Sequence, residues 1–252
     1  MLHEMKLQDV PFDRIARSEK TVELRLFDEK RQRIQVGDFI QFSRQAALED
    51  RIQVRVTALH RFDGFAALYA AIPPERLGYR PGETADPADM DAYYPKDAQA
   101  QHGVLAIELR KTALQRFVDA HDHGYSFGEN YTAALSEICA GRKRTHWMWY
   151  IFPQIRGLGR MDISVYFSIR DMQEARDYYA HPILGAHLRE ITQAVLETES
   201  SDPMIVFGDP DAYKLRSSMT LFKHAAPDDP LFQAVLDRCC MGDEDPRTLA
   251  RI

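Results

Sequence analysis

Apolar and polar residues alternate along the first part of the chain. In KTVELRLF, residues 20–27, Val22, Leu24 and Leu26 take every second position, which is the period of a half-buried strand. Similar alternating segments follow it along the chain. One short segment with a helical pattern precedes it, and another follows it. These patterns predict further strands at 39–42, 51–59 and 104–109, and helices at 11–18 and 64–72. The first part of the chain therefore predicts a small mixed β-barrel or sheet.

The spacing of apolar residues changes to a helical period after Lys111. Apolar residues then recur at spacings of three and four, the stripe that packs one helix against another. Gly141 predicts a helix end, and Asp171 predicts the N-cap of a later helix. We therefore expect an α+β chain of two domains, a small β-barrel with flanking helices at 1–112 and a mainly α-helical domain at 113–252.

The stretch 80–103 lies between two of the predicted elements and is rich in Pro, Asp and Gly. Asp86 followed by Pro87 resembles an N-cap with proline at the first helical position, so a short helix is expected there. A long insertion beside a compact β unit often forms a lid or binding loop, although a plain surface excursion is commoner.

Composition and charge narrow the class of protein. The chain is 45% hydrophobic and 28% charged, as in soluble globular proteins, and its formal charge of −6 argues against a nonspecific nucleic-acid coat. No apolar run approaches the roughly 18 to 20 residues of a membrane span, and the start lacks the hydrophobic core of a signal peptide. Three cysteines, without zinc-binding spacing, and the lack of dinucleotide or phosphate-loop motifs predict no metal and no cofactor. We expect a cytoplasmic protein without a membrane partner.

Four polar residues lie close together at the start of the first alternating segment: Lys20, Thr21, Glu23 and Arg25. The commoner interpretation is a solvated outward face, because charged residues that alternate along a strand mostly face water. The alternative is a ligand site that Lys20 joins through a small bulge. Two cations, a carboxylate and a hydroxyl would then surround one ligand.

The order of motifs in this part resembles the ASCH domain. It runs from MKL at 5–7 and PF at 11–12 through EKTVELRL at 19–26 and VGD at 36–38 to VLAIEL at 104–109. The resemblance implies a PUA-like β-barrel whose cleft, beside the lysine-bearing strand, binds RNA or nucleoside ligands. Some members of that family are acetylcytidine amidohydrolases, and another group is reported as ribonucleases.

In the amidohydrolases a lysine, a threonine three residues later and a distant glutamate carry the reaction. Lys20 matches the lysine, whereas the threonine position falls on Glu23 and Thr21 lies earlier. Glu75 matches the distant glutamate loosely, and its alternative is a capping or solvent-facing residue. In a partly dry cleft Lys20 could polarise a carbonyl, Glu23 could act as a base or hold a base edge, and Arg25 could contact a phosphate. The same residues would serve a binding pocket equally well.

Two runs in the second part combine cations with other functional groups. GRKRTHWMWYIFPQIRGLGR at 141–160 places basic residues beside the only two tryptophans, an arrangement that can stack a base, although a core segment is commoner. YKLRSSMTLFKHA at 213–225 could bind an anion through its cations and hydroxyls, or begin a solvated helix. If these runs line a cleft, the ligand-binding candidates are Arg142, Lys143, His146, Trp147, Lys214, Arg216 and Ser217.

The same runs, with HPILGAHLRE at 181–190, are similar to a mainly helical bacterial family of uncharacterised function. Some of its members carry the name calpastatin, but nothing here resembles a protease-inhibitor repeat. The resemblance covers nearly all of 113–252 and implies a bacterial setting without implying a reaction.

The preferred hypothesis is recognition or processing of RNA, a nucleotide or a modified nucleoside at a site that contains Lys20, Glu23 and Arg25. Processing would make the protein a hydrolase of a modified nucleoside or of RNA. One alternative is a non-catalytic RNA-binding or regulatory module. Another places a hydrolase or transferase for a nucleotide derivative, such as ADP-ribose, in the helical domain.

Overall fold

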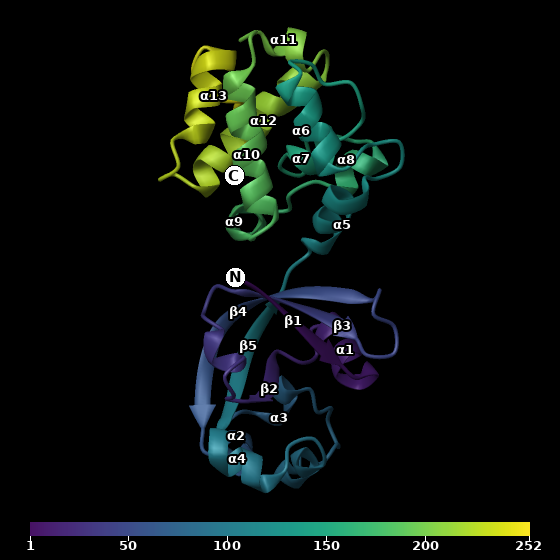
Figure 1. The fold of residues 1–252 in the computed structure, drawn as a ribbon, viewed down its shortest axis with the longest axis vertical. Coiled ribbons are helices and arrows are strands. Elements are labelled where there is room, and N and C mark those ends of the chain that lie inside the picture. The colour runs from purple at the N-terminus through teal and green to yellow at the C-terminus, as the bar shows by residue number, and fades with distance from the viewer. The chain divides into compact units, whose positions relative to one another are not determined.

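Figure 1 shows the computed structural model, which describes every residue from Met1 to Ile252. Contacts between residues divide the chain into two compact units, Met1–Thr112 and Ala113–Ile252. We call them the sheet unit and the helical unit and describe each by itself. A curled sheet followed by a helical region confirms the predicted α+β fold class.

The sheet unit is built on five strands in the order β1-β3-β4-β5-β2. β1 pairs with β3 in parallel, and the other neighbouring pairs are antiparallel. A register shift between Val56 and Ala58 interrupts the pairing of the long strand β4, and irregularities of this kind bend and twist a sheet. The strands are β1 (Leu2–Leu7), β2 (Val22–Leu26), β3 (Phe39–Arg44), β4 (Arg51–Phe62) and β5 (Val104–Lys111).

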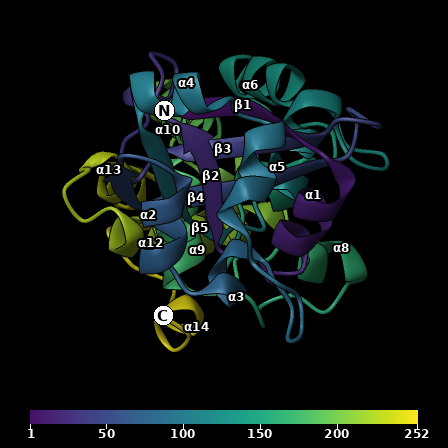
Figure 2. The same cartoon turned by 90° about the horizontal axis from the view of Figure 1, so that it is seen from below.

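Short helices occupy the connections between these strands. The side chain of Asp86 accepts a hydrogen bond from the Ala88 N–H, which caps the 3-10 helix η2 and confirms the short helix predicted after Asp86. Helix α2 packs against β4 and β5, as the view in Figure 2 shows. The helices are α1 (Asp9–Ala16), η1 (Arg31–Arg33), α2 (Phe65–Ala71), α3 (Pro74–Leu77), η2 (Pro87–Ala92) and α4 (Lys96–His102).

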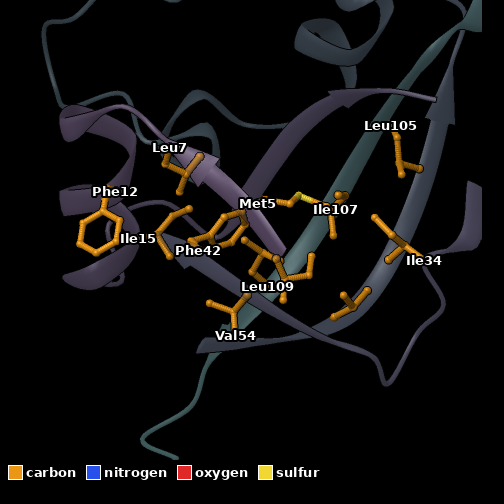
Figure 3. Packing of buried hydrophobic residues seen from close by; sticks show 12 residues of the cluster. Met5, Leu7, Phe12, Ile15, Ile34, Phe42, Val54, Leu105, Ile107 and Leu109 are labelled. Carbon is orange, nitrogen blue, oxygen red and sulfur yellow. The ribbon is translucent and has the colours of Figure 1, made fainter. Parts of the chain in front are cut away.

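Alternate residues of β5 contribute to two separate hydrophobic clusters. Ile107 belongs to the cluster that also contains Phe12 and Ile15 of α1 (Figure 3). Ala106 belongs to the cluster that contains Phe65 of α2. Because successive side chains of a strand point to opposite faces, β5 carries apolar residues on both faces of the sheet.

The helical unit contains ten helices, and the longest ones form its core. Helix α10 packs against α6, α9 and α13, while α12 packs against α9, α13 and α14. The helices are α5 (Gln115–His123), α6 (Tyr131–Cys139), α7 (Met148–Ile151), α8 (Asp162–Tyr166), α9 (Met172–Ala180), α10 (Leu184–Glu197), α11 (Pro203–Val206), α12 (Asp211–Ala225), α13 (Leu231–Cys240) and α14 (Pro246–Leu249).

Two predicted helix signals of this unit are confirmed. The side chain of Asp171 accepts a hydrogen bond of 2.8 Å from the Glu174 N–H at the start of α9. Gly141 follows the end of α6 with a φ of +77°, a left-handed conformation that favours glycine. None of the helices combines the length and the apolar composition that a membrane span requires.

Candidate functional site

The sheet unit contains a cleft with a volume of about 680 Å³. Lys20, Glu23 and Arg25 all line it, together with residues of five other segments: the end of β1, helix α1, Gln45 after β3, the α2–α3 region and η2 with the residues after it. The structure thus brings three of the predicted site residues to one concave surface. A few polar groups converging in a cleft of this size are typical of a small-ligand site.

The face of the sheet on which the side chains of Glu23 and Arg25 lie follows from the pairing of β2 with β5. Glu23 lies directly opposite Ile107, and Arg25 lies opposite Leu105. Directly paired residues share a face of the sheet, and both partners belong to the apolar cluster that α1 covers. The interpretation of these alternating polar residues as a solvated face therefore does not hold for Glu23, whose exposed fraction is only 3%.

The two oxygens of the Glu23 carboxylate have different surroundings. Oε1 lies 2.7 Å from Arg25 Nη1 in an ion pair whose side chains are both largely buried. Oε2 is buried without a hydrogen-bond partner and lies 3.6 Å from Lys20 Nζ, which is longer than an ordinary hydrogen bond. A buried carboxylate oxygen without a donor is costly, so a ligand that supplies an N–H or O–H would be stabilised here.

Arg25 is held by more than its carboxylate. Nη1 donates hydrogen bonds to Tyr94 Oη at 3.1 Å and to the Leu24 carbonyl at 3.2 Å, and Nη2 donates to the Lys6 carbonyl at 3.2 Å. These bonds join β2 to β1 and to the residues after η2. Arg25 therefore positions Glu23, and few of its donors remain for a ligand.

Lys20 is buried at the entrance to β2, with an exposed fraction of 8%. Its Nζ donates a hydrogen bond of 3.1 Å to the Leu77 carbonyl at the end of α3. Burial lowers the pKa of the Lys20 ammonium, the guanidinium groups of Arg25 and Arg14 act in the same direction, and Glu23 opposes them. The Lys20 ammonium therefore loses its proton more readily than that of a surface lysine.

Tyrosines form much of the remaining wall, and the sequence interpretation missed them. The hydroxyl groups of Tyr69 and Tyr79 lie 3.1 Å apart, and both residues line the cleft. Tyr94, which binds Arg25, also stacks on Phe65 with ring centroids 5.5 Å apart. The signal in the sequence was the adjacent pair Tyr93 and Tyr94 within the insertion rich in Pro, Asp and Gly.

Two further cations and one further carboxylate also line the cleft. Lys6 is exposed, and its side chain makes no hydrogen bond or ion pair. Arg14 donates two hydrogen bonds from Nη2 to the Glu83 carboxylate, at 2.8 and 3.0 Å. Asp89 at the start of η2 also lines the cleft, and the sequence interpretation did not select it.

Thr21 and Glu75 are not among the residues that line the cleft. The backbone of Thr21 donates to the Arg76 carbonyl and accepts from the Leu109 N–H, which anchors the start of β2. Glu75 is exposed on α3, a helix that contributes Leu77 to the cleft instead. The structure therefore does not support Glu75 as the distant carboxylate or Thr21 as a ligand contact.

In the helical unit, Trp147 is a core residue with an exposed fraction of 0%. Its Nε1 donates a hydrogen bond of 2.8 Å to Glu137, whose carboxylate also accepts from the Arg144 N–H and from the N–H and hydroxyl of Thr145. These donors lower the pKa of Glu137 against the raising effect of its burial. Trp147 cannot stack on a base, and the core interpretation of this run describes it correctly.

The predicted cations of this unit are mostly engaged within the protein. Lys143 and Lys214 each lie 2.7 Å from Asp211, and their ammonium groups also face Trp147 and Trp149. Arg216 donates to the carbonyls of Asp243 and Glu244, and Ser217 donates to Asp245 at 2.7 Å. Arg142 and His146 are exposed. These residues do not form one free anion-binding cluster.

No group of three His, Cys, Asp or Glu side chains in the chain is arranged to hold a metal ion.

Comparison with known families agrees with this architecture. The ASCH domain family model matches residues 5–113, so the sheet unit is an ASCH domain of the PUA-like class. The family described as protein of unknown function DUF1810 matches residues 111–252, more than half of the chain. The chain belongs to this DUF1810 family and carries an ASCH domain before its helical unit. An ASCH domain indicates binding of RNA or a nucleotide.

The solved structures that are similar to the chain include the following three. The crystal structure of the conserved hypothetical protein Rv1873 from Mycobacterium tuberculosis has 42% identity and a TM-score of 0.51, and the match covers 54% of this chain and 94% of that one. The hypothetical protein PH0355 has 26% identity, a TM-score of 0.38 and coverages of 44% and 100%. The protein PF0455 from Pyrococcus furiosus has 28% identity, a TM-score of 0.35 and coverages of 45% and 99%. No curated protein matches the chain.

Proposed function

We propose that the cleft of the sheet unit binds a nucleoside unit of RNA or a free nucleotide, with Lys20 and Glu23 facing its base. The observation that carries the proposal is Glu23 Oε2, a buried acceptor without a partner in a lined cleft. Each base carries an N–H donor beside an acceptor on one edge, and Glu23 with Lys20 supplies the complementary acceptor and donor.

The wall and rim of the cleft suit the remaining parts of such a ligand. Tyr69 and Tyr79 supply aromatic surface and hydroxyl groups. The free ammonium of Lys6 supplies a positive charge for a phosphate without giving up an existing contact. The net charge of −6 and the small number of rim cations favour a local nucleoside contact over a long phosphate-tracking groove.

The test is a calorimetric titration of the full chain with the four ribonucleosides, their 5′-monophosphates and short single-stranded RNAs. The variants Glu23→Gln and Lys20→Ala are compared with Glu29→Gln and Lys30→Ala, which change exposed residues outside the cleft. We expect at least a tenfold loss of affinity in the first pair only, a difference of about 1.4 kcal/mol. Equal affinities in all four variants would place binding elsewhere.

Salt dependence separates the base contact from the phosphate contact. Affinity for an uncharged nucleoside should change little between low and high salt, while the added affinity of a monophosphate should fall as salt rises. Lys6→Ala should remove that added affinity and leave nucleoside binding unchanged. A nucleoside affinity that falls as steeply as that of the monophosphate contradicts a base-reading cleft.

Hydrolysis is a second candidate function, because burial lowers the pKa of Lys20 next to the carboxylate of Glu23. In that reaction, the hydrolysis of an amide, Glu23 would take a proton from a water molecule while the water oxygen forms a bond to the acyl carbon. Lys20 would polarise the carbonyl, and the bond from that carbon to the amide nitrogen would break as the nitrogen takes the proton from Glu23.

Mass spectrometry of a panel of modified nucleosides and short RNAs tests this reaction directly. Turnover that is lost in both Lys20→Ala and Glu23→Gln supports hydrolysis in the cleft. Turnover retained in both variants moves the chemistry to another site. Binding without turnover in the unaltered chain identifies the cleft as a recognition module.

A further inference from the structure

Two histidines from different helices of the helical unit form a direct hydrogen bond. Nδ1 of His121 on α5 lies 2.9 Å from Nδ1 of His187 on α10, and the two rings are within 3° of parallel. One of the two nitrogens must carry the proton and the other must accept it. The surroundings of His121 decide which nitrogen donates.

The other nitrogen of His121 faces a backbone carbonyl. Nε2 lies 2.9 Å from the Tyr150 carbonyl oxygen, which also accepts a hydrogen bond of 2.9 Å from the Tyr178 hydroxyl. Tyr150 is the third residue of the four-residue helix α7, so its carbonyl lies in the last turn and has no partner farther along that helix. Nε2 also lies 3.1 Å from the Tyr178 hydroxyl, but that hydroxyl gives its proton to the Tyr150 carbonyl. A carbonyl can only accept, so His121 Nε2 carries a proton.

This assignment determines the state of His187. If His121 is neutral and protonated on Nε2, its Nδ1 is an acceptor, and the proton between the two rings belongs to His187 Nδ1. Burial lowers the pKa of His121 to about 3, and burial also lowers the pKa of His187, so both rings are neutral near pH 7. The lone pair of His187 is therefore on Nε2.

The environment of His187 leaves that lone pair accessible. His187 is half-buried, and its Nε2 has no protein partner and is not among the enclosed polar atoms. Tyr131 of α6 stacks on the ring with centroids 3.6 Å apart and donates a hydrogen bond of 2.6 Å to Glu190. The ring is thus fixed in position and in tautomer while one basic nitrogen remains free.

The groups around His187 also limit the chemistry of its ligand. Burial lowers the pKa of His187, and the carboxylates of Glu190 and Asp122 oppose this effect. His121, Tyr131 and His181 are further titratable neighbours. Two carboxylates disfavour an anion, and the imidazole lone pair and carboxylate oxygens can only accept hydrogen bonds. A complementary ligand must supply donors.

We propose that His187 is the proton acceptor of a second site, separate from the sheet-unit cleft, that takes an uncharged hydroxyl-bearing ligand such as the sugar of a nucleoside. His121 acts as a positioning residue that holds His187 with its Nε2 lone pair directed to the ligand. The site requires neither Trp147 nor the cations of the basic runs.

The first test is a multiple-bond nitrogen–proton NMR spectrum of the full chain labelled with ¹⁵N-histidine at neutral pH. We expect the Nδ1–H form for His187 and the Nε2–H form for His121. The opposite tautomer at His187 would overturn the proposal, because its Nε2 would then be a donor. The exposed His123 on α5 provides an internal reference.

The second test measures the reactivity of each histidine toward diethyl pyrocarbonate by peptide mass spectrometry. Neutral imidazole attacks this reagent, and free histidine loses reactivity as pH falls through about 6.5. We expect modification of His187, protection of His121, and reactivity of His187 that persists at a lower pH than that of free histidine. An unreactive His187 would show that its Nε2 lone pair is not accessible, which would overturn the proposal.

Ligand protection tests the chemical class. Ribose and cytidine at millimolar concentration should slow the modification of His187 and leave that of His123 unchanged. The protection should persist in Glu23→Gln, because the cleft of the sheet unit is a different site. Protection by the diamine putrescine instead of the sugars, or by none of these probes, would overturn the assigned ligand class.

Discussion

Arg25 Nη1 lies 2.7 Å from Glu23 Oε1, while Oε2 of the same carboxylate is buried without a hydrogen-bond partner. Arg25 therefore pairs closely with one oxygen of Glu23, while Lys20 Nζ lies 3.6 Å from the other, beyond an ordinary hydrogen bond. Buried ion pairs contribute little net stability, because the desolvation of both groups offsets their attraction. The pair is therefore weak evidence for a stabilising role, which agrees with the ligand site that we propose here.

Removing Arg25 should destabilise the sheet unit. Arg25→Ala leaves the Glu23 carboxylate buried without its cation, and breaking a buried pair from one side costs about 3–5 kcal/mol. Urea unfolding followed by circular dichroism measures the loss. Tryptophan fluorescence serves as the control, because both tryptophans lie in the helical unit and should report no change.

The double variant Glu23→Gln with Arg25→Ala extends this prediction. It removes the buried carboxylate charge that Arg25→Ala leaves unpaired, so we expect the double variant to be more stable than Arg25→Ala alone. Additive losses in the double variant would show that the ion pair does not determine the cost.

Glu137 should be a main determinant of stability in the helical unit. Its carboxylate accepts from two backbone N–H groups, the Thr145 hydroxyl and Trp147 Nε1. Glu137→Gln replaces one accepting oxygen with an N–H₂ donor and should cost about 2 kcal/mol, as expected for charged hydrogen bonds. The matched control is Glu197→Gln on the surface of α10, and a similar loss in both variants would contradict this role.

The stability of the helical unit should fall as pH falls from 7 to 5. Burial lowers the pKa of His121 to about 3, so between pH 3 and 6.5 the unfolded chain binds more protons at this residue than the folded chain does. At pH 5 this difference costs about 2 kcal/mol. The lowered pKa values of His181, about 4, and of His187 act in the same direction.

Urea unfolding followed by tryptophan fluorescence at several pH values measures this effect. His121→Gln should be less stable at pH 7.5 and should show a shallower pH dependence. Carboxylates with ordinary or lowered pKa values remain ionised at pH 5, so they contribute little in this window. An unchanged slope in His121→Gln would show that other groups titrate.

Trp147 and His146 should respond differently to substitution. Trp147→Ala removes a fully buried side chain and should destabilise the helical unit by about 3–5 kcal/mol, with Trp149 as the remaining fluorophore. His146→Ala changes an exposed residue and should alter stability by no more than about 0.5 kcal/mol. A folded His146→Ala protein that loses nucleotide binding would restore the interpretation of this run as a ligand site.

Local patterns account for the parts of the fold that the sequence predicted well. The alternation around Val22 and Leu24 identified β2, and the signals at Asp86 and Asp171 identified the starts of η2 and α9. These features depend on backbone geometry and on hydrogen bonds between residues a few positions apart. A single sequence contains that information directly.

The site depended on contacts that local patterns do not encode. Alternation shows that Glu23 and Val22 lie on opposite faces of β2, but both faces are covered in the folded unit, by clusters that include Ile107 and Phe65. Tyr94, which binds Arg25, lies 69 positions away in the sequence. The polar residues of β2 line a cleft only because the curled sheet and the η2 segment pack around them.

The amino-acid sequence by itself determined the division into a β-rich and an α-helical part, the two family resemblances and the choice of Lys20, Glu23 and Arg25. The tertiary structure decided that Trp147 is a core residue, that Glu75 faces solvent, and that His121 meets His187 across 66 positions. The physical reason is that periodicity reports which residues are apolar, whereas burial, hydrogen-bond partners and proton positions depend on distant segments that pack together.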